Sequence, residues 1–194
     1  MKTRTIRAGL CGVLLSLLSV ALIPCAHAQS TAAVDVVWEA TSANFGGRMM
    51  DIDRFQNVYS VGDTYVNGVV LTRKFSPDGQ VLMTLGEPGV GGDDEYHFRS
   101  PSGVVTAPSG DIFVADGHFT NNRIVKYSKD GKFIKAWGKT GYAPGEFRVP
   151  HCIAMDKRGR LFVCDRSNAR IQIFDQDGKF LAKWYQFGMP SGIA

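Results

Sequence analysis

The sequence lacks the features that mark several special classes of protein. With 44% hydrophobic residues, 21% charged residues and 22 glycines, its composition is neither that of a disordered chain nor that of collagen. After residue 28, lysine and arginine are interleaved with aspartate and no basic block remains, which argues against a nucleic-acid partner. We therefore expect an ordinary globular protein.

The chain also lacks an apolar run long enough to span a membrane. Its longest run covers residues 8–23, follows a basic start and is too short for a spanning helix. Ala26 and Ala28 are small residues that mark a cleavage site before Gln29. Residues 1–28 are therefore predicted to be a signal peptide. Its removal, with three basic residues and no acidic ones, lowers the formal net charge from +4 to +1.

The predicted export places the protein in a periplasm or outside the cell, with no transmembrane anchor after cleavage. Cysteine is scarce there, because Cys11 and Cys25 leave with the leader and only Cys152 and Cys164 remain. A three-residue loop over residues 157–159 would place these two directly opposite one another on adjacent strands. Two interpretations stay open, namely a cross-strand disulfide in an oxidising compartment and two buried free thiols.

Internal repeats are the strongest positive feature of the sequence. One copy covers residues 98–138 and the next covers residues 147–184. Both contain Phe-Arg, a proline, a short apolar run, Asn-x-Arg-Ile, Asp-Gly-Lys-Phe and a tryptophan. A more divergent copy spans about residues 46–86, and a further one begins at "FGMPSGIA". A repeat of this length indicates a propeller or a solenoid.

Each copy holds four short apolar runs that alternate with period two and are too short for helices. In the third copy these runs are "CIAMD", "RLFVCD", "RIQIFD" and "KFLAKW". Asp-Gly pairs link the third and fourth runs, at Asp78-Gly79, Asp130-Gly131 and Asp177-Gly178. This pair favours a two-residue hairpin turn with both residues at positive φ. Four antiparallel strands in each copy predict propeller blades.

The fold class predicted is therefore all-β, with a lead-in over residues 29–45 and an incomplete β-propeller over residues 46–194. Its blades are expected at about residues 46–86, 97–138 and 146–185, with the start of another at residues 187–194. A closed ring needs about four to eight blades. We therefore expect a truncated reading frame, a fragment or an assembly that closes between chains.

The residues that follow residue 85 resemble a known family. "RIVKYSKDGKFIKAWG" and "RIQIFDQDGKFLAKW" resemble NHL repeats. More narrowly, "LGEPGVGGDDEYHF", "GEFRVPHCIAMD" and "GRLFVCDRSNARIQIFDQDGKFLAKW" resemble peptidyl-α-hydroxyglycine α-amidating lyases and their bacterial relatives. The resemblance extends more weakly back to Val34.

The resemblance implies a zinc ligand at His151. In the resembling lyases a Pro-His at the start of a blade's innermost strand points into the central tunnel, and three such histidines hold one catalytic zinc. "VPHCIAMD" matches this motif. The preceding ligand is expected where Arg48, Met49 and Met50 stand, and the last belongs to a blade beyond Ala194. One ligand of three is thus visible, and a tunnel histidine without metal is the alternative.

The resemblance also implies a base at His118. The tyrosine base of the family is expected in Asp-Gly-Tyr ahead of Asn-x-Arg-Ile, and here the stretch reads "ADGHFTNNRIV". An imidazole titrates closer to neutral pH than a phenol, so it could take a proton from a substrate hydroxyl. The alternative is a polar loop histidine at the propeller mouth. The family's catalytic arginine belongs to a further blade.

Several other residues recur with the repeat and are interpreted as structural. Asp116 and Asp165 each end a second strand, and Arg123 and Arg170 each begin a third. Recurrence in both well-matched copies argues for a hydrogen-bonded turn rather than catalysis. The first-blade counterpart is expected at Asp63. Four aromatic residues are expected to pack between blades: Phe98, Phe147, Trp137 and Trp184.

Two functions from different classes follow. The first is a zinc-dependent carbon–nitrogen lyase acting on peptidyl-α-hydroxyglycine, whose own activity is uncertain because the metal and base positions are incomplete. The second is a non-catalytic exported propeller that binds a peptide, glycan or protein partner. The acidic stretch "GGDDEYHF" over residues 91–98 is read as a calcium site or, alternatively, a solvated loop between blades.

Overall fold

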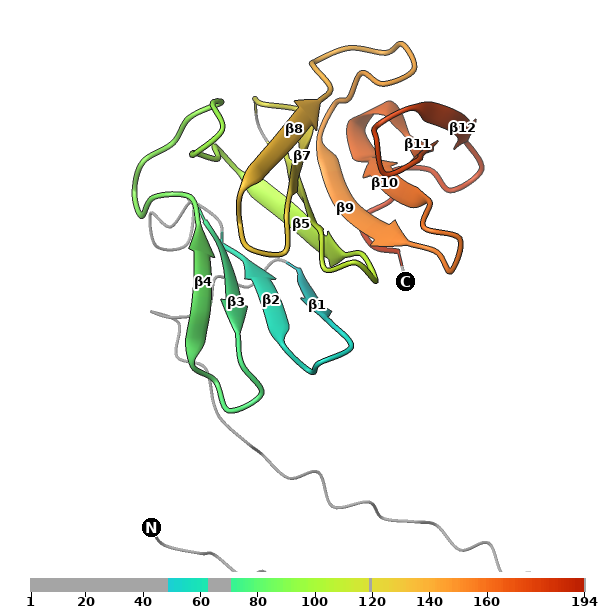
Figure 1. Cartoon of the computed structure of the whole chain (residues 1–194). Helices are drawn as coiled ribbons and strands as arrows, with labels where there is room; N and C mark the ends of the chain where they lie inside the picture. Colours follow the sequence, from blue (N-terminus) through green and yellow to red (C-terminus); the bar gives the residue numbers. More distant parts are fainter. Residues whose placement is uncertain (1–48, 63–70, 119, 194) are drawn as a thin grey trace, which may run out of the picture. The chain divides into compact units, whose positions relative to one another are not determined.

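The computed structural model describes residues 49–62, 71–118 and 120–193. Within these ranges the chain forms twelve β-strands and one 3₁₀ turn, and it has no α-helix (Figure 1). None of the helical structure in these ranges is long and apolar enough to cross a membrane. The predicted leader, the lead-in segment, Arg48 and Asp63 lie outside the described residues.

The strands form three four-stranded antiparallel sheets, in each of which consecutive strands pair. Blade 1 comprises β1 (Met50–Ile52), β2 (Val58–Val61), β3 (Thr72–Phe75) and β4 (Val81–Leu85). Blade 2 comprises β5 (Pro101–Thr106), β6 (Ile112–Asp116), β7 (Arg123–Tyr127) and β8 (Phe133–Trp137). Blade 3 comprises β9 (Pro150–Met155), β10 (Leu161–Asp165), the 3₁₀ turn η1 (Arg166–Asn168), β11 (Arg170–Phe174) and β12 (Phe180–Trp184). The all-β class with four-stranded blades is confirmed.

The hairpin turns differ from the sequence prediction. Only the glycine of each Asp-Gly pair has positive φ, with values of 86° at Gly79, 77° at Gly131 and 79° at Gly178. In the first turn the N–H of Ser76 bonds to the carbonyl oxygen of Gln80, which leaves a three-residue loop. The two-residue turn predicted from Asp-Gly was wrong. Each hairpin instead closes as a turn with a glycine bulge, and the strand register shifts beside it.

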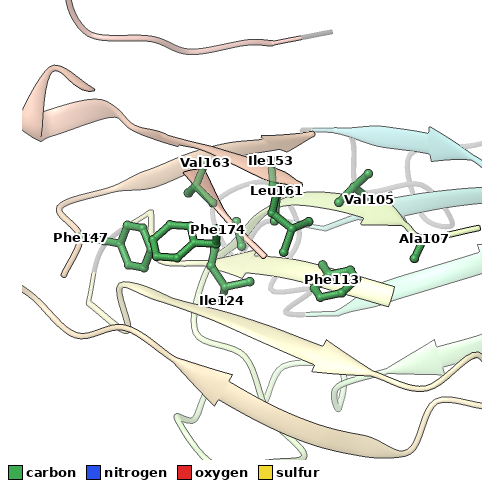
Figure 2. Packing of buried hydrophobic residues seen from close by; sticks show 10 residues of the cluster. Val105, Ala107, Phe113, Ile124, Phe147, Ile153, Leu161, Val163 and Phe174 are labelled. Atoms are coloured by element: carbon green, nitrogen blue, oxygen red, sulfur yellow. The ribbon is translucent and has the colours of Figure 1, made fainter. Parts of the chain in front are cut away.

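Apolar side chains from neighbouring blades share a core. Between blades 2 and 3, Phe147 and Phe174 lie with ring centroids 5.6 Å apart and are fully buried (Figure 2). Trp137 of β8 contacts Phe174 from the other blade, at 6.2 Å between centroids. Trp184 differs from the expectation, because it is 38% exposed and packs on Phe162 within its own blade. The blade contacts are therefore carried mainly by the buried phenylalanines and aliphatic side chains.

The first strands of the three blades approach one another closely. A Cβ added to Gly103 of β5 would lie 3.2 Å from the Cα of Cys152 in β9 and 3.2 Å from the Sδ of Met49. Glycine therefore permits this spacing. Asp51 of β1 also accepts hydrogen bonds from both the N–H and the hydroxyl of Thr106 at 2.7 Å. The approach at Gly103 thus places β9 against β5, and the bonds of Thr106 tie β1 to β5.

Cys152 and Cys164 are paired in the register of β9 and β10, with Cα atoms 5.0 Å apart. The structure joins them by a disulfide bond across a sequence separation of 12 residues. Closing a loop of this size in the unfolded chain stabilises a fold by about 3 kcal/mol in the chain-entropy account. The bridge fixes the strand that carries His151.

Candidate functional site

Two histidines from different blades lie side by side. His118 follows β6 in blade 2, and His151 is the second residue of β9 in blade 3. Their ring centroids are 5.4 Å apart, with the ring planes inclined at 57°. Both side chains are half-buried. The fold thus brings together the two residues to which the resemblance gave chemical roles.

The tautomer of His151 follows from its contact with a backbone oxygen. Its Nδ1 lies 3.1 Å from the carbonyl oxygen of Ser191. Because a carbonyl oxygen can only accept, Nδ1 donates its proton. In the neutral ring the lone pair is then on Nε2, the nitrogen that a metal ion or a substrate proton would approach.

The equivalent residue in blade 2 makes a similar connection without an imidazole. The hydroxyl oxygen of Ser102 lies 2.6 Å from the carbonyl oxygen of Pro150. Ser102 therefore links the start of β5 to the start of β9, as His151 links β9 to the following segment at Ser191. A serine serves for this bond in one blade, so the fold does not by itself require a histidine in the other.

Gly117 sets the approach of the two histidine-bearing segments. A Cβ at this position would lie 2.5 Å from Cγ of the Pro150 ring and 2.8 Å from the Cα of Asn122. Such contacts do not occur without movement of the neighbouring groups. His118 thus follows a glycine that packs directly on the residue preceding His151.

Arg166 also belongs to the site and was missed by the sequence reasoning. Its Nε donates to the hydroxyl oxygen of Ser191 at 3.0 Å, on the same residue whose carbonyl oxygen accepts from His151. Arg166 directly follows Asp165 at the end of β10, where blade 2 has Gly117. In the sequence, its place directly after the recurring aspartate was the one feature that could have drawn attention to Arg166. Its partner Ser191 lies 25 residues later, so the contact between them was not evident.

Asp165 and Arg170 form a buried hydrogen-bonded pair. The carboxylate is fully buried, the arginine is 2% exposed, and Nε and Oδ2 are 2.7 Å apart. The same carboxylate accepts from the N–H of Arg148 at 2.7 Å and from the amide of Asn168 at 2.8 Å. The guanidinium also donates to three carbonyl oxygens of the preceding loop, those of Tyr142, Ala143 and Glu146. The pair therefore fastens the loop between blades 2 and 3.

Blade 2 repeats this arrangement with Asp116 and Arg123. Their Nε–Oδ2 distance is 3.0 Å, and the carboxylate also accepts from the N–H of Ser100 at 2.9 Å. The guanidinium donates to carbonyl oxygens in the acidic stretch, those of Asp93, Asp94 and His97. The recurring aspartate and arginine thus occupy equivalent places and hold equivalent loops.

The acidic stretch around residues 91–98 is organised by His97. The two nitrogens of this ring face Asp94 at 2.8 Å and Glu87 at 3.4 Å. The hydrogen bond with Asp94, followed by that with Glu87, raises the pKa of His97, and the same bond lowers the pKa of Asp94. Arg123 binds the backbone oxygens of this stretch, so a cation already occupies part of its oxygen donors.

Metal donors elsewhere are sparse. Among the residues that the structure describes, no group of three or more histidine, cysteine, aspartate or glutamate side chains is placed to hold a metal ion. Met49 packs against the core between blades 1 and 2, and Met50 is 57% exposed. His118 and His151 are therefore two imidazoles without a third such donor in the described ranges.

Comparison with known proteins identifies the repeats. The NHL repeat model matches residues 98–127 and 147–174. NHL repeat-containing protein 3 of Homo sapiens is 37% identical over 104 residues, which are 52% of this chain and 30% of that protein. The peptidyl-glycine alpha-amidating monooxygenase of Mus musculus is 40% identical over 120 residues, which are 59% of this chain and 12% of that protein.

A relative named as a lyase alone matches over more of its own length. The probable peptidyl-alpha-hydroxyglycine alpha-amidating lyase of Caenorhabditis elegans is 32% identical over 134 residues, 66% of this chain and 38% of that protein. The chain thus spans less than half of each of these relatives. Among solved structures, a streptogramin B lyase (TM-score 0.50, 20% identity) covers 68% of this chain and 38% of its own. Kuenenia stuttgartiensis hydrazine synthase (TM-score 0.56, 10% identity) covers 75% and 38%. At these identities the structural likeness concerns the fold alone.

Proposed function

Because the chain is an NHL-repeat propeller related to the amidating-lyase domain, we propose that it is an exported lyase-type module whose site contains a pair of histidines. In this proposal His151 is the metal ligand and His118 occupies the place of the base. The residues described here would bind the metal but would turn over little substrate by themselves. The observation that carries the proposal is the 5.4 Å approach of the two rings from separate blades.

The described residues fit a zinc ion only in part. Metal-binding histidines usually donate the N–H of the ring nitrogen that does not bind the metal to a carboxylate or a backbone carbonyl oxygen. Nδ1 of His151 makes such a bond, to the carbonyl oxygen of Ser191. A catalytic zinc ion takes three protein ligands and keeps one position open. The imidazole of His151 alone, with no group of three such donors in the described ranges, does not complete such a site. This incompleteness is why we expect weak turnover.

The surroundings of the pair suit a peptide-like ligand with a carboxylate. Arg166 reaches Ser191, which also contacts His151, so a guanidinium lies beside the pair. Guanidinium groups bind carboxylates through paired hydrogen bonds. Peptidyl-α-hydroxyglycine, the substrate named for the related Caenorhabditis elegans lyase, ends in a carboxylate. His118 would accept the proton of its hydroxyl.

The disulfide supports the export part of the proposal. Disulfides persist in secreted and periplasmic proteins and are rare in reducing compartments. The bridge between Cys152 and Cys164 lies on the two strands that lead into the site. In an oxidising compartment this disulfide would stay formed, and it would hold the start of β9 in place even when no ligand is bound.

A second candidate is the non-catalytic binding propeller, and one observation favours it. Ser102 makes in blade 2 the same kind of link to the next segment that His151 makes in blade 3. If the imidazole served only as such a link, the mouth would bind a peptide, glycan or protein without a metal. Metal binding therefore separates the two candidates.

The test measures Co²⁺ binding, by visible absorption, and glyoxylate release from a peptidyl-α-hydroxyglycine. We expect wild-type protein to bind one Co²⁺ and His151→Ala to lose that binding, whereas His118→Ala should keep it. His97→Ala is the matched control, because both ring nitrogens of His97 face carboxylates, those of Asp94 and Glu87, and it should bind Co²⁺ as wild type does.

Equal Co²⁺ binding by wild type and His151→Ala would refute the metal role and leave the binding propeller. Whatever glyoxylate release the wild type shows should fall about 100-fold or more in His118→Ala, the loss typical of a removed general base. Unchanged release in that variant would refute the base role of His118.

A further inference from the structure

We infer that Asn122, a residue of blade 2, is a positioning residue for His151 of blade 3. Its side chain holds the backbone of Val149 in a left-handed conformation and so sets the direction in which β9 begins. The chemical importance of this inference rests on the proposed function, but the geometry that carries it is independent of any metal.

Val149 has a backbone conformation that its side chain disfavours. Its φ is 61°, which is rare for a β-branched residue, and it precedes Pro150, before which an extended conformation is preferred. The left-handed conformation costs about 1–2 kcal/mol for such a residue. Strain of this kind persists only where surrounding contacts hold it, and it is found preferentially at functional sites.

Two hydrogen bonds hold the backbone of Val149. Its carbonyl oxygen accepts from the N–H of Arg166 in its own blade at 3.0 Å, and the bond to its N–H comes from the neighbouring blade. The N–H of Val149 donates to Oδ1 of Asn122 at 2.9 Å. Asn122 is 4% exposed, and its amide nitrogen donates to the hydroxyl oxygen of Thr140 at 2.8 Å, with a longer contact to the carbonyl oxygen of Thr120. The amide is thus fixed at both ends, and its oxygen is aimed at Val149.

The same place in blade 2 lacks this device. Ser100 is the counterpart of Val149, and its N–H donates to the carboxylate of its own blade, at 2.9 Å from Oδ1 of Asp116. Unlike Val149, Ser100 does not have a positive φ. The N–H before the proline is therefore redirected in the blade that carries His151 and not in the blade that carries Ser102.

Asn122 is also dispensable for the turn in which it lies. Its φ is 50°, and its counterpart Ala169 in blade 3 has nearly the same φ of 51° with no polar side chain. The neighbouring Asn121 and its counterpart Asn168 both bond to the buried carboxylate of their own blade. Asn121 thus makes a contact that recurs within each blade, whereas Asn122 makes a contact between blades 2 and 3.

Pro150 connects the backbone of Val149 to both histidines. It directly follows Val149, directly precedes His151 and packs on Gly117, which precedes His118. A change in the backbone of Val149 therefore moves the Pro150 ring against Gly117 and turns the imidazole of His151 away from Ser191. Asn122 in this way fixes how the two rings face each other.

The test uses ¹⁵N-histidine-labelled full-length exported protein and reads the His151 tautomer from long-range ¹H–¹⁵N spectra. We expect wild type to show the Nδ1–H form, because Nδ1 donates to Ser191. Alanine is compatible with this backbone, because Ala169 has nearly the same φ at the equivalent position of blade 3. In Asn122→Ala the Nδ1–H form of His151 should no longer predominate. The Co²⁺ affinity of this variant should fall about 10–100-fold, as is typical when a partner that orients a ligand is removed.

Matched variants separate positioning from general destabilisation. Asn121→Ala should lower stability but leave the His151 tautomer unchanged, because Asn121 does not contact Val149. Asn122→Asp keeps an acceptor for the Val149 N–H and should restore the wild-type spectrum. If Asn122→Ala does not fold, Asn122→Gly replaces it, since glycine adopts φ of 50° without strain.

A wild-type His151 spectrum in Asn122→Ala or Asn122→Gly would overturn the inference. If wild type binds no Co²⁺, the proposed function fails, while the tautomer comparison still decides whether Asn122 positions His151.

Discussion

Replacing Arg170 by methionine lowers the free energy of unfolding by about 3–5 kcal/mol, because the change leaves a buried carboxylate without its cation. Asp165 is fully buried, and Arg170 is its closest charged partner at 2.7 Å. The change also frees three carbonyl oxygens of the loop between blades 2 and 3. Methionine keeps most of the side-chain volume, so the loss reports charge and hydrogen bonding rather than a cavity.

Urea unfolding followed by tryptophan fluorescence measures this loss. Arg160→Met is the control, because Arg160 pairs with Asp156 in the same blade at 2.6 Å but is 40% exposed. A pair with such exposure contributes about 0–1 kcal/mol. Equal losses in the two variants would show that burial does not distinguish the pairs, and the structural role given to Asp165 and Arg170 would be wrong.

Replacing Phe174 by alanine lowers the free energy of unfolding by about 3–5 kcal/mol, the range for a buried phenylalanine. The Phe174 ring is fully buried at the contact between blades 2 and 3 (Figure 2). It meets Phe147, Trp137 and Phe180 at centroid distances of 5.6, 6.2 and 5.9 Å. The cavity therefore opens where two blades join, and hydrogen exchange should speed up in β7 and β11 together.

Thermal unfolding and hydrogen exchange check this prediction. Phe187→Ala is the control. Phe187 follows the last strand, is 52% exposed and contacts Trp184. Its change should stay within about 0.5 kcal/mol, as for ordinary surface substitutions. A Phe174→Ala protein that exchanges faster in β11 but not in β7 would mean that the two blades do not share one core.

The repeat made the blades predictable from the sequence. Alternating apolar runs predicted the strands, and the three-residue loop over residues 157–159 placed Cys152 opposite Cys164, as the register has them. The Asp-Gly turns were misjudged, because that pair suits two hairpin types and only the backbone φ of the aspartate separates them. Local sequence thus determined the strands better than it determined their connections.

The site was predictable only where a single residue had a motif. His118 and His151 could be named, but their contact depends on the packing of two blades, which no local pattern encodes. Arg166 was missed for the same reason, since it meets the site through Ser191. The left-handed backbone of Val149 had no signal at all, because neither valine nor the following proline favours it.

The most direct test of the account is a ¹³C-edited NOE spectrum of the aromatic and histidine ring protons. The account predicts a cross-peak between the rings of His118 and His151, whose centroids are 5.4 Å apart, that disappears in His118→Ala. Phe147 and Phe174, at 5.6 Å, provide an internal reference of similar distance. A visible phenylalanine cross-peak with none between the histidines would contradict the account, since the blades would then pack without forming the site.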